Sequence, residues 1–529
     1  MRASTPLGRQ GRCFAYALAV MVLVAGCVAQ ATPSVHGPSQ SNSPSPLGSP
    51  SPTPPIICDD NPGHYTPMPA DCVVPTEQVL PTFYLPPLDT PAPKTDNPKL
   101  PPGIATLPPA KAWHGKTFYT PPSGSASRLI GVGPDDTVYV LLERVLPLAQ
   151  PTPTSALVVP DVDASVIALR PDGSLRPGWS STGVHVAGFP VSYHVNEAGT
   201  VFVASGANPF NSGAETQSQM TITAIGPDGK IVAGWPYHTP AAKQPYYPDL
   251  LVLGPGGTVC FLQYKPGAST GSDASMMVYC LGSDGKVLPG WPYSSQSSFW
   301  SPAVGPDGTV YVARSTSTKT TTNPYFYPYE VLAIGPDGKP KSGWTWSKDG
   351  ADGLTAIMPT RDGRIYLLLG GDGGKAELIV LDRNGKTLQD HVELASALTS
   401  PNYKDAVLTS DGSLFVAVNG GNADAVNAYS PDGSQMTGWP QLIGGWGDIA
   451  VGADGSVGVA WTVYGATSTD ETSVVALFDK TGKLRPGYPM ASDYLVSLDL
   501  SYGLAVASDG TAYGSAETAL DSRIVSFGR

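Results

Sequence analysis

Short loops that combine aspartate with glycine are the features of this chain most easily read as chemistry. Carboxylate oxygens in such loops ligate calcium, and the densest examples lie at residues 349–353 and 371–373. A complete calcium loop needs several oxygen donors at alternate positions, whereas most of these loops offer one aspartate. The pattern therefore predicts turns in which aspartate bonds to its own backbone. The metal content stays open: the sequence allows a calcium ion but does not support one.

A serine nucleophile and a histidine metal site are two further chemistries to weigh. Residues 267–271 match Gly-x-Ser-x-Gly, but a nucleophile elbow needs a strand–turn–helix, and this match lies in a loop rich in glycine and serine. His185 and His194 lack the short spacing of metal ligands, so packing is the favoured role. We assign no catalytic residue, and the sequence favours a protein that is not an enzyme.

The elements that hold these residues follow from an internal repeat. Seven Asp-Gly-type turns are each followed, six residues after the glycine, by a ring. These rings are Trp179, Trp235, Trp291, Trp344, His391, Trp439 and Tyr488. A period of about 50 residues indicates an array of similar small units. The constant interval favours packing between units, with His391 and Tyr488 in place of tryptophan.

A second series of turns alternates with the first and is followed by alternating apolar runs, such as residues 309–312. Asp-Gly between such runs predicts a hairpin, so each unit has four antiparallel strands. In the fourth unit we expect strands at residues 301–305, 309–313, 329–335 and 339–346. Repeated radially, such units form an all-β propeller, whereas a β-solenoid has more uniform rungs and stacked sandwiches would not repeat so often.

The blade count follows from where the repeat stops. The last unit ends on its third strand, at residues 522–529. Because a ring needs its first and last blades joined, we expect a strand near residues 113–119 to supply the missing fourth strand. The prediction is eight four-stranded blades closed by an N-terminal strand, with seven blades as the alternative.

The beginning of the chain has the layout of an export signal. Arg2, Arg9 and Arg12 precede an apolar run at residues 13–25. The run ends in Leu-Val-Ala-Gly-Cys, which resembles the lipobox of bacterial lipoproteins and implies a lipid on Cys27. An ordinary secretory signal with a chance cysteine is the alternative. The expected location is extracytoplasmic, with the chain anchored to the bacterial membrane by lipid.

Three regions result: residues 1–27 are the signal peptide, 28–110 a linker rich in Pro, Ser and Thr, and 111–529 the propeller. In an exported protein, Cys58 and Cys72 favour a local disulfide. Cys260 and Cys280 fall on neighbouring expected strands and form either a cross-strand disulfide or two buried thiols. The net charge of −12 and the small share of basic residues argue against a nucleic-acid partner.

Part of the ring series resembles the quinoprotein-like (PQQ-type) β-propellers, an eight-bladed family. The matching pieces are Gly229-Lys230 with Trp235, Gly285-Lys286 with Trp291, and Gly338-Lys339 with Trp344. The resemblance implies that the tryptophans dock neighbouring blades. Enzymes of that family carry a quinone with calcium beside an adjacent Cys-Cys pair. This chain has no adjacent cysteines, so we expect no quinone cofactor.

Ligand binding is expected on the longer loops, which leave one face of a propeller. Aromatic side chains on loops of a rigid scaffold suit protein or carbohydrate contacts. The candidates are Tyr237, Tyr246, Tyr247, Phe299, Trp300, Tyr325, Phe326 and Tyr327. The predicted function is a binding or scaffolding module for a protein or a cell-surface glycan. The alternatives are a glycan-active hydrolase or lyase with carboxylates at the channel mouth, and an envelope assembly factor.

Overall fold

Asp-Gly turns between alternating apolar runs build antiparallel hairpins in every repeat. In the fourth repeat, β15 (Phe299–Val304), β16 (Val310–Ser315), β17 (Tyr329–Ile334) and β18 (Pro340–Lys348) pair in that order. The turn between the first two strands has Gly308 at φ 78°, where a Cβ would be strained. Each strand predicted for this repeat overlaps its observed counterpart.

The protein is seen in a computed structural model. It describes residues 111–113, 116–146, 162–207, 219–241, 251–264, 276–295, 299–315, 329–348, 354–370, 377–394, 402–419, 424–443, 447–464, 471–492, 503–517 and 522–528. All of these lie in one compact unit that includes Pro98–Arg529. The described part of the chain has no helix with the length and apolar character needed to cross a membrane.

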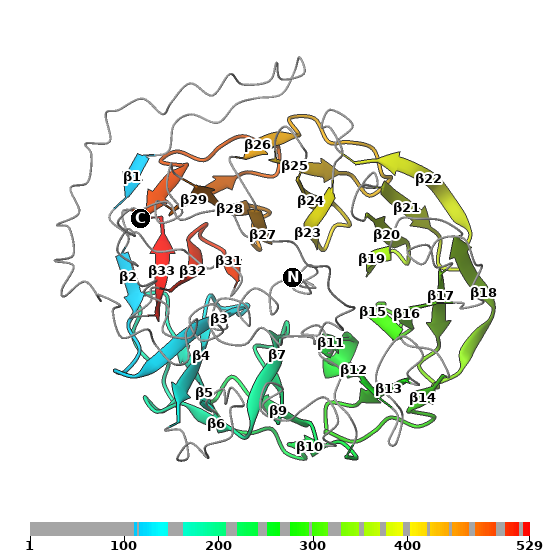
Figure 1. Cartoon of the computed structure of the whole chain (residues 1–529), viewed down its shortest axis with the longest axis horizontal. Coiled ribbons are helices and arrows are strands. Elements are labelled where there is room, and N and C mark those ends of the chain that lie inside the picture. Colours follow the sequence, from blue (N-terminus) through cyan, green and yellow to red (C-terminus); the bar gives the residue numbers. More distant parts are fainter. Residues whose placement is uncertain are drawn as a thin grey trace, which may run out of the picture. The chain divides into compact units, whose positions relative to one another are not determined.

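Eight such sheets follow one another around a ring, which is an eight-bladed β-propeller (Figure 1). The strands of each blade are called a to d from the axis outward. Blade 1 is β3 (Ser125–Val132), β4 (Val138–Val145), β5 (Val162–Leu169) and β6 (Val184–Val186). Blade 2 is β7 (Phe189–Val195), β8 (Val201–Gly206), β9 (Thr221–Ile225) and β10 (Tyr237–His238). Blade 3 is β11 (Leu251–Leu253), β12 (Val259–Tyr264), β13 (Met276–Leu281) and β14 (Tyr293–Ser294). Blade 4 is β15 to β18.

The second half of the ring repeats the same order. Blade 5 is β19 (Leu354–Pro359), β20 (Ile365–Leu369), β21 (Glu377–Leu381) and β22 (Thr387–Glu393). Blade 6 is β23 (Asn402–Leu408), β24 (Leu414–Asn419), β25 (Asp424–Tyr429) and β26 (Gln441–Ile443). Blade 7 is β27 (Gly447–Val451), β28 (Val457–Tyr464), β29 (Glu471–Phe478) and β30 (Met490–Ser492). Blade 8 has β31 (Leu504–Val506), β32 (Ala512–Glu517) and β33 (Ser522–Phe527) as its strands a to c.

An N-terminal strand closes the ring, as predicted. Strand β2 (Lys116–Tyr119) pairs antiparallel with β33 and is the outer strand of blade 8. The closing strand begins at residue 116, three residues after the start of the expected range of 113–119. Residue Trp113 belongs to a separate strand, β1 (Lys111–Trp113), which pairs in parallel with β30 as a fifth strand of blade 7. The prediction of eight blades is confirmed.

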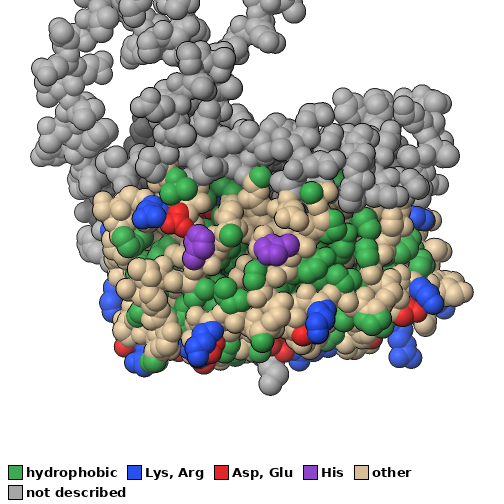
Figure 2. All heavy atoms as spheres, turned by 90° about the horizontal axis from the view of Figure 1, so that it is seen from below, with side chains coloured by type: hydrophobic (Ala, Val, Ile, Leu, Met, Phe, Trp, Pro, Cys, Tyr) green, Lys and Arg blue, Asp and Glu red, His purple; other side chains and the backbone are tan. Residues whose placement is uncertain are grey.

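The two faces of the ring differ because the strands of a blade alternate in direction. All a–b and c–d turns lie on one face, called here the tight-turn face, and the b–c and d–a connections lie on the other, the long-loop face. Figure 2 shows the ring edge-on, with Lys, Arg, Asp and Glu side chains along one rim and others toward the opposite edge. The core lies between neighbouring blades: one cluster, for example, joins Tyr139 of blade 1 with Tyr193 and Val203 of blade 2.

Candidate functional site

The second residue of strand b occupies a recurrent position at the joint between blades. Six of the eight blades place a ring there: Tyr139, Phe202, Tyr311, Tyr366, Phe415 and Tyr513. In blades 1, 2, 4 and 6 the paired residue on strand c is alanine: Ala168, Ala224, Ala333 and Ala428. A large residue opposite a small one leaves room for the next aromatic layer, which keeps the joint densely packed.

That layer is the ring series that follows the c–d turns. The five tryptophans are 3–8% exposed. Each donates its indole Nε1–H to a carbonyl oxygen in the c–d turn of the following blade, over 3.0–3.4 Å. The pairs are Trp179 with Pro227, Trp235 with Ser283, Trp291 with Pro336, Trp344 with Arg383, and Trp439 with Lys480. These rings are therefore interior residues between blades and are not available to a surface ligand.

The turn glycines accept this contact because they have no side chain. A Cβ on Gly229 would lie 3.1 Å from the Trp179 ring, and its φ of +77° is also costly for other residues. Tyr488 makes the equivalent contact from blade 7, donating its hydroxyl to Phe527 O over 2.9 Å. Where a ring of the preceding blade lies against the turn, as Trp179 lies against Gly229, the absence of a side chain on the glycine makes room for that ring.

Blade 5 joins blade 6 differently, at the place where His391 stands in the ring series. The backbone of His391 lies in β22, and its side chain is outside the described part of the structure. Pro431 O, the carbonyl that an indole would cap, accepts from Tyr366 Oη over 2.7 Å and from Arg364 Nη1. Gln389 Nε2 donates to Asp432 O over 2.5 Å. Tyr366 and Arg364 thus bond to the carbonyl that tryptophan bonds elsewhere, and Gln389 bonds to the next carbonyl of the same turn.

Phe118 of β2 occupies the eighth joint, which the sequence reasoning missed. Its ring meets Tyr513 edge-on at 4.8 Å between centroids. Tyr139 and Trp179 meet in the same way at 5.8 Å. A Cβ on Gly173, the c–d turn glycine of blade 1, would lie 2.9 Å from Phe118 O. No turn precedes Phe118 in the sequence, so only its place in the closing strand reveals this role.

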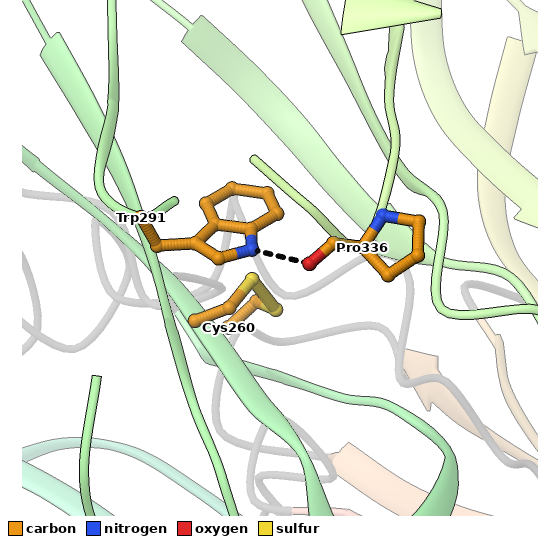
Figure 3. The surroundings of a disulfide bond; sticks show 4 residues. Cys260, Trp291 and Pro336 are labelled. Atoms are coloured by element: carbon orange, nitrogen blue, oxygen red, sulfur yellow. Dashed lines mark hydrogen bonds between the residues drawn. A yellow bond between two sulfur atoms is a disulfide. The ribbon is translucent and has the colours of Figure 1, made fainter. Parts of the chain in front are cut away.

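A disulfide fills the joint of blade 3. Cys260 and Cys280 are paired residues of β12 and β13 and are bonded to each other, which confirms the predicted cross-strand disulfide. They stand at the positions that a ring and an alanine occupy in four other blades. Figure 3 shows the disulfide beside the Trp291 ring, whose Nε1–H donates to Pro336 O. The cystine is 0–1% exposed, so its role is in packing.

The tight-turn face has aspartates that cap their own turns. In the turn of blade 6, the hydroxyls of Ser430 and Ser434 and the backbone N–H of Ser434 bond to Asp432 and hold the pKa of its carboxyl far below the usual range. Asp172 shows the same direction of pKa shift, caused first by the Ser174 hydroxyl. Among the described residues, no three His, Cys, Asp or Glu side chains are grouped to hold a metal. The two loops singled out for calcium, and the 267–271 serine match, lie outside that part.

The aromatic candidates for ligand binding fall into two groups. Tyr246, Tyr247, Tyr325, Phe326 and Tyr327 lie outside the described residues, as do Cys27, Cys58 and Cys72. The other three lie in strands where loops were expected. Phe299 begins β15 and is 1% exposed, so its predicted place on a loop surface is wrong. The register of β15 turns this ring into the core between blades 3 and 4.

Tyr237 and Trp300 keep part of their surface exposed. Tyr237 lies in β10, with its ring 6.2 Å from that of Phe261, and burial raises the pKa of its hydroxyl. Trp300 packs against the core between blades 4 and 5 and donates its indole N–H to Leu354 O over 3.1 Å. The next residue, Ser301, has φ 47°, an uncommon conformation for a residue with a Cβ. Tyr237 and Trp300 are the described members of the candidate surface.

Ion pairs mark the strand ends on the long-loop face, and the sequence did not reveal them. Asp163 forms an ion pair with Arg144, whose Nη2 lies 2.6 Å away, and His185 Nδ1 lies 3.0 Å from the same carboxylate. In blade 1, Glu143 is buried and lies 2.7 Å from Arg128 Nε. Burial raises the pKa of Glu143, while the Arg128 charge opposes that shift. His185 therefore pairs with a carboxylate, and His194 lies 3.3 Å from Ser192 Oγ.

The chain matches no known family and no curated protein in sequence. In structure it is similar to prolyl oligopeptidase B from Galerina marginata (11% identity, TM-score 0.42, covering 76% of this chain and 56% of that chain). It is also similar to BamB from Moraxella catarrhalis (13%, 0.36, 73% and 94%). A third match is Kuenenia stuttgartiensis hydrazine synthase (13%, 0.38, 64% and 96%). The chain thus spans little more than half the length of the oligopeptidase, and these likenesses concern the fold alone.

Proposed function

We propose that the protein is an exported, lipid-anchored β-propeller that binds a protein or a cell-surface glycan through its long-loop face. Cys27 would hold the lipid, and residues 28–110 would space the propeller from the membrane. The observation that carries the proposal is the difference between the two faces. Every a–b turn closes with backbone hydrogen bonds within a few residues, such as Gly308 N–H to Gly305 O at 3.0 Å.

The longer b–c connections of the long-loop face lie in one half of the ring. The b–c connections of blades 1 to 4 span residues 146–161, 207–220, 265–275 and 316–328. Those of blades 5 to 8 are shorter, at residues 370–376, 420–423, 465–470 and 518–521. Tyr237 and Trp300 lie on blades 2 and 4, within the same half. Variable connections on a rigid scaffold are where propellers and other repeat folds place recognition.

Photo-crosslinking on the full-length protein in its own membrane tests this assignment. A photoreactive residue at Trp300 or Tyr237 should capture one discrete protein, or a glycan released by glycosidase treatment. The same residue at Lys230, exposed on the tight-turn face, is the matched control and should capture nothing specific. Capture at Lys230 together with none at the other two positions would contradict the proposed face.

The anchor is tested separately. A Cys27→Ser protein should lose metabolic labelling with a radioactive fatty acid and should leave the membrane fraction. Retained labelling would show that the lipid is attached elsewhere. Retention in the membrane without labelling would show another kind of anchor.

A further inference from the structure

Two charged side chains of non-adjacent blades meet on the tight-turn face. Arg361 Nη2 lies 2.6 Å from Glu197 Oε1. Glu197 belongs to the a–b turn of blade 2 and Arg361 to that of blade 5, so the ion pair passes the inner ends of blades 3 and 4. The other ion pairs recorded for described residues of this face stay within one blade, as Asp135–Arg176 and Asp454–Arg485 do.

The repeat makes this pair stand out, because the eight a–b turns can be aligned by their closing hydrogen bonds. Their second residues, in blade order, are Pro134, Glu197, Pro255, Pro306, Arg361, Ser410, Ala453 and Ser508. Only blades 2 and 5 have a charged residue there. The two charges are opposite, and the two side chains are in contact. Chance placement on a large surface would not favour this coincidence of position, sign and distance.

We propose that Glu197 and Arg361 form a brace that ties blade 2 to blade 5 and restrains blades 3 and 4 between them. In relation to binding, this inference rests on the proposed function: Tyr237 and Trp300 lie on two of the four blades that the brace spans, on the opposite face. A partner that shifts these blades would strain the ion pair. The brace therefore couples the two faces of this half of the ring.

The strength of the brace follows from its exposure. Both side chains are 49% exposed, so salt screens the pair, and its contribution is that of a surface ion pair. A contact of this strength does not hold a fold together. It changes how often the inner turns open, a local equilibrium that amide hydrogen exchange reports. The reporting amides are Gly199, bonded to Asn196 O, and Gly363, bonded to Thr360 O.

Hydrogen exchange on the full-length protein, without ligand, tests the brace. In Glu197→Gln and in Arg361→Gln, peptides containing these turns should exchange about two- to five-fold faster than in the native protein. Glu197→Arg should be faster still, since it opposes two cations. The charge swap Glu197→Arg with Arg361→Glu should restore the native rate. In about 1 M salt, the native protein and Glu197→Gln should exchange alike.

Lys286→Gln is the matched control, because it removes an exposed ion pair with Asp284 on the same face but within blade 3. It should leave exchange at the turns of blades 2 and 5 unchanged. Native rates in both Gln variants, or a charge swap that exchanges as fast as Glu197→Arg, would overturn the brace. Neither result depends on a partner, so failure of the brace is distinguishable from failure of the proposed binding function.

Discussion

Blades 3 and 5 join their neighbours in opposite ways. Blade 3 keeps its outer ring, Trp291, and has the Cys260–Cys280 disulfide where other blades place a ring on strand b. Blade 5 keeps the strand b ring, Tyr366, and has His391 at the outer position. There Tyr366 and Gln389 bond to the turn of blade 6. The joint of blade 3 therefore has no ring at the second position of strand b, and the joint of blade 5 has no tryptophan at the outer position.

The difference shows that a blade joint has two separable parts. The strand b ring fills volume, and a cystine of suitable size replaces it in blade 3. The outer ring fills volume and also satisfies a turn carbonyl, and a buried carbonyl without a donor is costly. Blade 5 therefore recruits a tyrosine hydroxyl, an amide and a guanidinium to this carbonyl and its neighbour. The strand b ring is thus replaced by a group that fills volume, and the outer ring by groups that donate hydrogen bonds.

Removing the outer ring of blade 3, Trp291, should have the largest effect on the free energy of unfolding. Trp291→Ala removes a nearly buried ring and leaves Pro336 O without its indole donor. We expect the free energy of unfolding to fall by about 3–5 kcal/mol in denaturant titrations. Leu388→Ala, at a side chain 53% exposed on blade 5, is the control and should change it by less than about 0.5 kcal/mol. Equal effects of the two would refute a packed joint.

Removing the disulfide should come next. Replacing Cys260 and Cys280 together by alanine should lower the free energy of unfolding by about 2–4 kcal/mol. The variant Cys260→Tyr with Cys280→Ala installs the ring-and-alanine pair of blades 1 and 4, and we expect it to recover part of that loss. If the double alanine variant is as stable as this one, the cystine does not stand in for a ring.

The tyrosine of blade 5 should make its joint sensitive to high pH. Burial raises the pKa of Tyr366 to about 12, against about 10 in an unfolded chain. Its contribution to stability is complete below pH 10 and is lost as the pH rises from about 10 to 12, because the unfolded state releases its proton first. Tyr366→Phe should therefore weaken the fall in stability over this range by about 2 kcal/mol. An unchanged pH profile would contradict a buried, protonated hydroxyl.

The amide of blade 5 should have the smallest effect. Gln389→Ala removes one hydrogen bond to Asp432 O, a carbonyl at a turn near solvent. We expect a loss of about 1 kcal/mol or less, measured in the same titrations as for Trp291→Ala. A loss as large as that of Trp291→Ala would mean that Gln389 alone replaces the tryptophan.

Much of the fold could be predicted because the same sequence pattern recurs in every blade. The Asp-Gly turns and the alternating runs define four strands per blade, and the missing last strand predicts closure from the N-terminus. The candidate surface was harder to predict. Phe299 and Trp300 come directly after a loop, and only the register of β15 shows that one ring is buried and the other partly exposed.

By itself, the sequence determined the repeat of four-stranded blades, with eight blades predicted and seven as the alternative. It also gave the series of rings, and the cross-strand cysteine pairing as one of two readings. All of these depend on local turn chemistry and on period, which are visible along the chain. Tertiary structure alone decided that Phe118 fills the joint between blades 8 and 1. It also decided that Tyr366 and Gln389 bond to the turn of blade 6, and that Glu197 forms an ion pair with Arg361. These contacts join residues far apart in sequence, and closing the ring is what brings them together.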